Sequence, residues 1–256
     1  HSSRPAFRGR IERRRVQPLS HTDILAALER IAARKPRVQC LTNTVAQSIT
    51  ANVLLAVGAD VSMATHPAEI IEMTQGAQAL LINLGTLDRQ REAAIAALLP
   101  VLPSLDMPVV LDPVFAQASP LRLALAQQML AARPLLVKAN GGEMKVLPPR
   151  EIPGGHIYIT TGPVDIISGP DGEYIIARGH GLMRQVTGTG CAAGALIAAF
   201  ASVTPQPACA AAMALTCFGA AAEFAAKISA GPGTFAAHLI DSLANMDADM
   251  LAGIEP

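Results

Sequence analysis

Residues 109–143 read VVLDPVFAQASPLRLALAQQMLAARPLLVKANGGE, and this stretch decides the fold class. A short apolar run from Val109 to Asp112 is followed by a helical pattern from Leu121 to Ala132 and by a second apolar run from Leu135 to Lys138. Two apolar runs of strand length joined by a helix are typical of a βαβ unit, whose parallel strands are buried on both faces. The stretch therefore predicts an α/β fold built on a parallel sheet.

The same alternation continues along the chain in both directions. We expect further strands at residues 38–42, 60–63 and 79–83, and further helices at 22–34, 45–57, 67–75, 89–102, 190–203, 207–229 and 234–251. The rhythm then changes, because the apolar runs 156–161, 165–168 and 174–178 are separated only by turn residues such as Gly162-Pro163. This pattern predicts a mostly parallel central sheet with helices on both faces and a short antiparallel meander near the C-terminal third.

The length of 256 residues fits one large α/β domain. We interpret residues 20–256 as a single domain and residues 1–19 as a disordered leader. The leader holds a run of arginines, for which a nucleic-acid arm or a transit peptide is the alternative interpretation: Arg4, Arg8, Arg10, Arg13, Arg14 and Arg15.

Charge and cysteine usage exclude several classes of protein. The 20 basic and 20 acidic residues balance to a formal net charge of zero, which gives no general attraction to nucleic acid or to an anionic membrane. Four cysteines without a CxxC pair, and the lack of a visible secretory signal, predict free thiols and a cytoplasmic location. The Ala-rich segment 191–227 is interrupted by Thr204-Pro205-Gln206-Pro207, and we expect two buried helices there, not a membrane span.

Polar residues stand at the carboxyl end of nearly every predicted strand, and ligands bind at these ends in sheets of this class. Asp112 ends an apolar strand and suits Mg²⁺, although an Asx turn or a helix cap would also explain it. Glu143 follows the next strand and is three residues after Asn140, so it can bind a hydrated metal while Lys138 meets a phosphate. The alternative for these residues is a surface loop capped by Asn140.

Gly188-Thr189-Gly190-Cys191 opens a helix rich in small residues. Backbone N–H groups at such a helix start can bind an anion, although the spacing is not that of a Walker A loop. Cys191 lies in the first helical turn, where the positive end of the helix dipole is expected to lower a thiol pKa. It is a candidate general base or nucleophile, or else a small buried residue, which is how we interpret Cys40, Cys209 and Cys217. A phosphate site, a metal and a base are sufficient for phosphoryl transfer to a hydroxyl.

Six motifs resemble, in this order, those of hydroxyethylthiazole kinases. They are Cys40-Leu41-Thr42-Asn43, Val61-Ser62-Met63-Ala64, Leu81-Ile82-Asn83-Leu84-Gly85-Thr86, Leu111-Asp112-Pro113-Val114, Asn140-Gly141-Gly142-Glu143 and Val186-Thr187-Gly188-Thr189-Gly190-Cys191. The resemblance implies a ribokinase-like fold, MgATP-dependent phosphorylation of the thiazole's hydroxyethyl group in thiamine salvage, and a homotrimer with active sites at subunit interfaces.

The resemblance also implies roles for individual residues. Those expected to contact the thiazole are Asn43, Met63 and Gly188. Those expected to contact ATP are Lys138 and Thr161, together with the anion-binding backbone at Gly190. Asp112 and Glu143 would organise Mg²⁺, and Cys191 would lie near the accepting hydroxyl as a base or as a positioning residue.

Three features depart from the usual pattern of that family. Phe115-Ala116-Gln117 stands where Gly-Ala-Gly is usual, Lys138 stands where Arg is usual, and the stretch from Glu143 to His156 is short. We expect the two missing glycines to restrict backbone approach to a phosphate, which leaves a non-catalytic thiazole or nucleotide binder as an alternative.

Two enzymatic alternatives also remain. A ribokinase-like ATP-dependent dehydratase, of the nicotinamide-hydrate repair type, would keep the fold but usually carries Asp where Cys191 stands. A hydrolase with a cysteine nucleophile would need an orienting histidine, and we interpret His66 and His180 as a helix-start residue and a loop residue.

Overall fold

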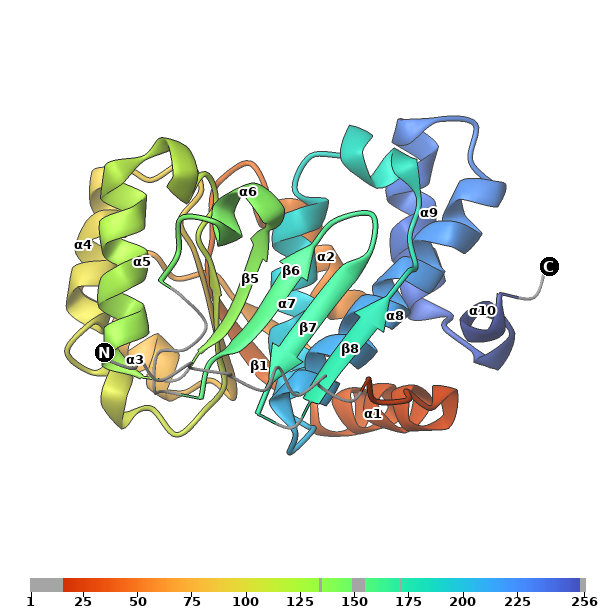
Figure 1. The fold of residues 1–256 in the computed structure, drawn as a ribbon, viewed down its shortest axis with the longest axis horizontal. Coiled ribbons are helices and arrows are strands. Elements are labelled where there is room, and N and C mark those ends of the chain that lie inside the picture. Colours follow the sequence, from red (N-terminus) through yellow and green to blue (C-terminus); the bar gives the residue numbers. More distant parts are fainter. Residues whose placement is uncertain (1–15, 134, 149–154, 171, 254–256) are drawn as a thin grey trace, which may run out of the picture.

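The computed structural model describes residues 16–133, 135–148, 155–170 and 172–253. Its strands are β1 (Arg37–Leu41), β2 (Asp60–Ser62), β3 (Ala79–Asn83), β4 (Val109–Asp112), β5 (Leu136–Asn140), β6 (Ile157–Thr161), β7 (Asp165–Gly169) and β8 (Gly172–Ile176). In the described part of the chain they form one eight-stranded sheet of order β2-β1-β3-β4-β5-β6-β7-β8. All pairs from β2 to β6 are parallel, and β6, β7 and β8 pair antiparallel (Figure 1). The mostly parallel sheet and its antiparallel meander are therefore confirmed.

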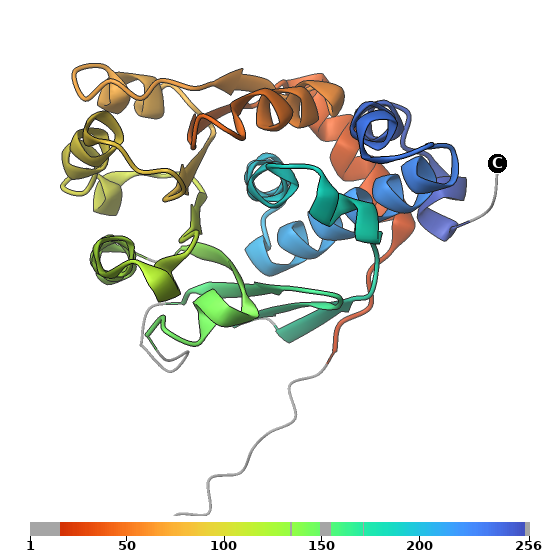
Figure 2. The same ribbon diagram turned by 90° about the horizontal axis from the view of Figure 1, so that it is seen from above.

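Helices cover both faces of this sheet. They are α1 (His21–Arg34), α2 (Gln47–Ala56), α3 (Ile70–Gln75), α4 (Arg89–Leu98), α5 (Pro120–Ala132), α6 (Gly141–Met144), α7 (Thr189–Ala201), α8 (Pro207–Lys227), α9 (Pro232–Ala244) and α10 (Ala248–Ala252). Short 3₁₀ turns are η1 (Leu102–Ser104), η2 (Ala116–Ala118) and η3 (Gly181–Gln185). Figure 2 shows α4 and α5 on one side of the curved sheet, and α7 and α8 on the other.

The side chains of each strand point alternately into two separate apolar cores. Successive residues of a strand point to opposite faces, so Ala79 and Leu81 of β3 enter the core under α7 and α8, while Leu80 and Ile82 enter the core under α4 and α5. Gly194 brings α7 close to the sheet, because a Cβ there would lie 3.1 Å from Leu81 Cδ1. This close approach places the start of α7 over the ends of the central strands.

Local sequence explains most element boundaries. Asp88 accepts a hydrogen bond from Arg91 N and so caps α4, and Ser119 caps α5 with Pro120 as the first helical residue. The predicted helix 234–251 is wrong as one element. It is two helices, because Asp247 accepts from Met250 N and begins α10 after α9 has ended. The four-residue helix α6 and the three 3₁₀ turns were not predicted.

The most apolar helix is part of the core. By length and composition α8 could cross a membrane, but 83% of its most apolar window is buried inside the fold. The expectation of a buried helix for residues 207–229 is therefore confirmed, apart from its last two residues.

The predicted leader lies mainly outside the described residues, which begin at Val16. Val16 forms an isolated β-bridge with Glu173, and Gln17 N donates to Glu173 O at 2.9 Å. The chain is thus already ordered along β8 before residue 20. The short stretch from Glu143 to His156 also falls partly on residues that the structure does not describe.

Candidate active site

Polar side chains gather where the parallel strands end. The carboxyl ends of β5 and β6 point to the same edge of the sheet, beside α6 (Figure 1). Asn83 and Asp112 are register partners at the ends of β3 and β4, so their side chains are neighbours. Both are buried, as is Lys138 on β5. This edge is the ligand-binding side of an open α/β sheet.

Lys138 and Asp112 form a buried ion pair. Lys138 Nζ lies 3.1 Å from Asp112 Oδ2, and neither side chain is more than 7% exposed. Burial raises the pKa of the Asp112 carboxyl, against the opposing pull of Lys138. Burial would lower the pKa of Lys138, but the charge and hydrogen bond of Asp112, together with the nearby acidic groups of Cys191 and Glu143, outweigh it and the net pKa is raised. Lys138 is therefore a firmly protonated cation at the end of β5.

Asn83 connects this ion pair to the segment after β1. Its Nδ2 donates to Asp112 Oδ2 at 2.9 Å, and its Oδ1 accepts from Asn43 Nδ2 at 3.0 Å. Asn43 Nδ2 also lies 3.3 Å from Cys191 Sγ. We call these five residues, Lys138, Asp112, Asn83, Asn43 and Cys191, the buried polar chain. It unites four predicted site residues with Asn83, to which no role was assigned.

Cys191 occupies the third position of α7 and is half-buried. Burial raises the pKa of its thiol, the negative charge of Asp112 raises it further, and Lys138 and Asn43 oppose the rise. The prediction that the helix start lowers this pKa is therefore wrong. Position in a helix is visible in sequence, whereas burial beside a carboxylate arises only from packing.

Gly188 precedes α7 in the left-handed conformation, with φ of 88°. A Cβ at this position would lie 2.8 Å from Ile49 Cγ2 and 3.0 Å from Ala46 Cβ. Glycine is thus required both by its backbone conformation and by close packing against the start of α2. This contact holds the start of α7 next to Asn43, whose Oδ1 accepts from Ala46 N at 3.0 Å.

Glu143 is buried and belongs to a capping box. Asn140 Oδ1 accepts from the N–H groups of Gly142 and Glu143, while Glu143 Oε2 accepts from Asn140 N at 2.8 Å. Glu143 Oε1 accepts from Phe115 N at 2.9 Å. Asn140 thus acts as a cap, but it caps the short helix α6 and Glu143 is buried, so these residues do not form a surface loop. Each carboxylate oxygen of Glu143 keeps a lone pair for a further partner.

Phe115 takes the backbone conformation that a glycine would take. Its φ is 58° and its side chain is 59% exposed. The chain adopts this left-handed turn without glycine, and the expected effect on backbone approach to a phosphate stays a prediction. The residue carries strain, at a cost of about 1–2 kcal/mol for an L-residue.

Phe115→Gly is expected to raise the free energy of unfolding by about 1 kcal/mol, because it removes that strain and loses little buried surface. Urea unfolding measures the change. Phe115→Ala is the matched control, since it removes the same ring but keeps the strained Cβ. Equal stability of the two variants would contradict the assignment of strain.

One cavity of about 650 Å³ opens beside the polar chain. Its lining includes all three residues assigned to ATP, namely Lys138, Thr161 and Gly190. Asn43, Gly188 and Cys191 are not part of that lining. The predicted residues thus divide into a group that lines the cavity and a group that does not.

Asp165 is a cavity residue that sequence reasoning missed. Its Oδ1 accepts from Gly162 N at 2.9 Å, and burial raises the pKa of its carboxyl while Gly162 N–H and Lys138 oppose the rise. The available signal was the Gly162-Pro163 turn, which directs the first residue of β7 back toward the end of β6.

The acidic residues fit a magnesium ion that is held largely by water and phosphate. Within the described ranges no three His, Cys, Asp or Glu side chains cluster closely enough to hold a metal by themselves. However, Asp112 Oδ1 is buried and has no hydrogen-bond partner. Mg²⁺ takes one or two carboxylates in addition to substrate phosphates and waters, so Asp112 and Glu143 suit it.

Met63 and the two histidines lie outside the polar chain. Met63 directly follows the outermost strand β2 and packs against the core under α7 and α8. His66 Nδ1 accepts from Ala68 N in the turn before α3, and His180 Nδ1 accepts from Leu182 N at the start of η3. Both histidines therefore serve local turns, as predicted.

Comparison with known proteins agrees with these motifs. A model described as the hydroxyethylthiazole kinase family matches residues 28–154 and 152–249. A probable hydroxyethylthiazole kinase of Agrobacterium fabrum (strain C58) is 39% identical over 222 residues, which cover 87% of this chain and 89% of that protein.

Solved structures share the fold. The structure of a hydroxyethylthiazole kinase protein from Pyrococcus horikoshii OT3 is 35% identical, covers 90% of this chain and 96% of its own, and has a TM-score of 0.83. A ribokinase-like superfamily protein from Enterococcus faecalis V583 is 15% identical over 84% of this chain and 88% of its own, with a TM-score of 0.60. The second likeness concerns the fold alone, and the predicted ribokinase-like α/β fold is confirmed.

Proposed function

The chain belongs to the hydroxyethylthiazole kinase family of thiamine salvage, and we propose that it transfers a phosphoryl group from MgATP to the hydroxyethyl group of 4-methyl-5-(2-hydroxyethyl)thiazole. The observation that carries this proposal is the buried polar chain. It runs from Lys138 in the wall of the cavity to Cys191. One hydrogen-bonded chain therefore connects the cation that would bind the phosphates to the region around Asn43 and Cys191, which we call the acceptor side because the thiazole hydroxyl would bind there.

ATP binds in the 650 Å³ cavity. Lys138 meets its phosphates as a point charge. Gly190 lies beside this cation, since a Cβ there would be 3.9 Å from Lys138 Nζ, and its backbone N–H at the start of α7 can bind the same phosphates. Thr161 offers a hydroxyl from the end of β6. These groups are fixed before the reaction, and such preorganised charge is the main contribution a protein makes to phosphoryl transfer.

Asp112 and Glu143 are the residues that would hold Mg²⁺, directly or through its waters. When bound, the ion would neutralise charge on the phosphates. Two backbone N–H groups fix Glu143, that of Asn140 in the capping box and that of Phe115 in the neighbouring loop, so the carboxylate needs no rearrangement to receive a ligand. Asp112 is fixed likewise by Lys138 and Asn83.

The thiazole binds on the far side of Lys138, against Asn43, Met63 and Gly188, with its hydroxyl near Cys191. The raised pKa of Cys191 means that the thiol is protonated at neutral pH. A protonated thiol orients the hydroxyl through a hydrogen bond and does not remove its proton. This suits a loose transition state, in which the attacking oxygen needs little activation before the bond forms. The hydroxyl proton passes to an oxygen of the transferred phosphoryl group as the new O–P bond forms and the bond to ADP breaks.

We extend the proposal to assembly and location. The protein is a single-domain cytoplasmic enzyme over residues 20–256, extended at its start by the segment of Val16 and Gln17 that contacts β8. It forms a homotrimer with active sites at subunit interfaces. Family resemblance supports the trimer.

Glu143→Gln is expected to raise the Mg²⁺ concentration for half-maximal rate by about tenfold, because the change removes a charge near the metal while keeping an acceptor for the cap. A Mg²⁺ titration of the rate at saturating ATP measures it. Glu173→Gln on β8, whose partner is Ser168, is the matched control. An unchanged titration would remove Glu143 from the metal site.

The test of the whole proposal is ADP release with MgATP, with and without the thiazole, combined with mass detection of the phosphorylated product. Thiazole-dependent ADP with that product is the expected result. Binding of thiazole or nucleotide without turnover would instead support a non-catalytic binder, and repair of a hydrated nicotinamide cofactor would support the dehydratase.

A further inference from the structure

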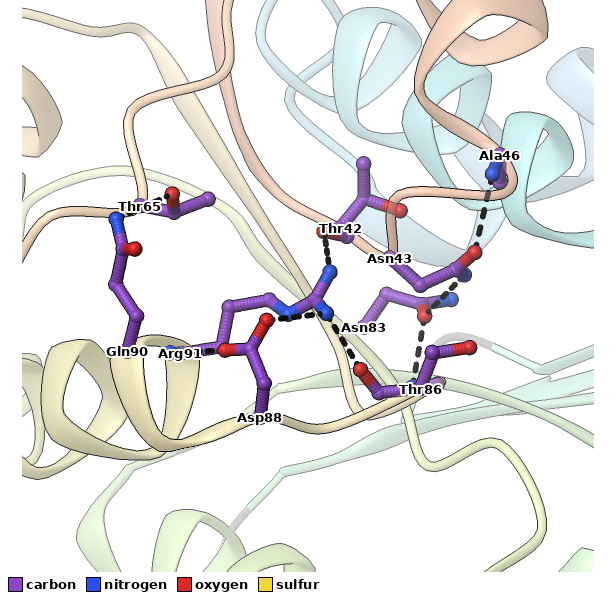
Figure 3. A network of polar contacts seen from close by, with 10 residues as sticks. Thr42, Asn43, Ala46, Thr65, Asn83, Thr86, Asp88, Gln90 and Arg91 are labelled. Atoms are coloured by element: carbon purple, nitrogen blue, oxygen red, sulfur yellow. Dashed lines mark hydrogen bonds and ion pairs between the residues drawn. The ribbon is translucent and has the colours of Figure 1, made fainter.

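Arg91 is a buried arginine at the start of α4 that none of the motifs includes. It is 3% exposed, and its guanidinium reaches two loops that carry site residues (Figure 3). Nη1 donates to Thr42 O at 3.1 Å, and Nη2 donates to Thr86 O at 2.5 Å. Thr42 follows β1, and Thr86 lies in the loop after β3. One side chain therefore joins the exits of two neighbouring strands.

Both loops lead directly to the buried polar chain. Thr42 is the residue before Asn43, and Thr86 follows Gly85. The backbone at Gly85 lies against the amide pair, because a Cβ there would be 2.9 Å from Asn43 Nδ2 and 2.9 Å from Asn83 Oδ1. Gly85 N also donates to Asn83 Oδ1 at 3.0 Å. A shift of this loop would move the amides that approach Cys191.

The loop after β3 is held in a strained shape. Thr86 has a φ of 44°, in the left-handed region that a β-branched residue rarely adopts. Such a conformation persists only where the surroundings impose it. The Nη2 contact to Thr86 O is the hydrogen bond that closes this turn onto α4.

Stability alone does not account for Arg91. Its ionic partner Asp88 has a side chain that is 54% exposed, and half-exposed pairs contribute only about 0–1 kcal/mol. Its Nε is buried without a hydrogen-bond partner within the described ranges, which costs free energy. An apolar side chain could fill the same space, so the arginine is better explained by the geometry it imposes on the two loops.

We propose that Arg91 is a positioning residue for the acceptor side of the reaction. It holds the loops after β1 and β3 in a fixed position relative to each other, so that the amides of Asn43 and Asn83 keep one orientation beside Cys191. This inference rests on the proposed function for its kinetic consequence, but its structural consequence at Cys191 does not depend on which substrate the protein takes.

Arg91→Lys is the informative variant, because lysine keeps the charge but cannot donate to two carbonyls in a fork. We expect KM for the thiazole to rise and kcat to fall, by about tenfold to a hundredfold in kcat/KM, since small misplacement of a reacting group has effects of this size. KM for ATP stays within about twofold of wild type, because the cavity lies beyond Lys138.

The chain offers a matched control in Arg133. Its guanidinium also donates to several backbone carbonyls, those of Leu102, Leu105 and Met107. Arg133 is half-buried and lies before β5, at the opposite end of the strand from the polar chain. Arg133→Lys is expected to lower the melting temperature without changing KM for the thiazole. If both variants change the thiazole kinetics equally, general loosening explains the effect and the proposal is wrong.

A second readout uses the thiol itself, without substrate. Iodoacetamide labelling followed by peptide mapping separates Cys191 from the half-buried Cys209. Labelling of Cys191 is expected to rise by about threefold or more in Arg91→Lys and to stay unchanged in Arg133→Lys, because only the first variant loosens the amides beside Sγ.

The two readouts separate the proposals. If wild type shows no thiazole-dependent turnover, the proposed function fails, and faster labelling of Cys191 in Arg91→Lys still supports the positioning role. If Arg91→Lys loses only stability, with unchanged thiazole kinetics and unchanged labelling, Arg91 has a structural role and the inference is overturned.

Discussion

Lys138→Met is expected to lower kcat/KM for ATP by about 10²–10³-fold and to destabilise the fold by about 3–5 kcal/mol. The loss of rate follows because Lys138 is the cation in the cavity wall that is aimed at the phosphates. The loss of stability follows because Asp112, 1% exposed, would remain as a buried carboxylate without its partner 3.1 Å away. Steady-state kinetics and urea unfolding measure the two effects separately.

The same variant should respond to pH in a defined direction. Burial already raises the pKa of Asp112 above its ordinary 3.8, and removal of Lys138 removes the main opposing influence. The folded variant then holds a proton that the unfolded chain releases, so its stability is greatest below that ordinary value and falls as pH rises. Lys138→Met is therefore expected to lose more stability than wild type between pH 5 and pH 8 (about 4 kcal/mol at most, from about 1.4 per pKa unit).

The double variant Lys138→Met with Asp112→Asn is the control that separates charge from packing. Asn has nearly the shape of Asp and can still accept from Asn83, but it leaves no unpaired charge. It should recover most of the lost stability and none of the lost rate. If stability is not recovered, the unpaired charge of Asp112 is not the cause of its loss, and recovery of both stability and rate would exclude a role for the charge of Lys138 in catalysis.

The fold was predictable where local pattern and tertiary burial agree. The strand over residues 79–83 was placed at its observed bounds, because Ala79 to Ile82 is a continuous apolar run that ends at the polar Asn83 and that the sheet buries on both faces. The C-terminal helix was misjudged where these signals conflict. The apolar period continues past Asn245, but the side chain of Asp247 starts a new helix by accepting from Met250 N.

Only those site residues that stand at the end of a strand or belong to a motif could be predicted from the sequence. Asp112 and Glu143 were found because each stands just after an apolar strand. Asn83 ends β3 in the same way, yet its importance depends on partners 29 and 40 positions away in the chain, Asp112 and Asn43. Arg91 belongs to none of the motifs, and its role is visible only from its buried hydrogen bonds to two loops.

Cys191→Ala is expected to lower kcat by about 10–100-fold while KM for ATP changes by less than about twofold. Sγ lies 3.3 Å from Asn43 Nδ2 on the acceptor side, and the nucleotide cavity is lined by other residues. Cys209→Ala on α8 is the matched control, since it removes another half-buried thiol away from the polar chain. Parallel losses of turnover and ATP binding would assign Cys191 to packing.

The pH dependence of the wild-type enzyme separates the two roles left for this thiol. Its pKa is raised above the ordinary 9.0 by burial and by Asp112, so below pH 9 the protonated form predominates. A thiolate base would make kcat climb about tenfold for each pH unit across that range, because only the deprotonated fraction would be active. A positioning thiol acts in its protonated form, so kcat should be level from pH 7 to pH 9 (within about twofold). We expect the level profile, and a continuous rise that Cys191→Ala abolishes would establish the base instead.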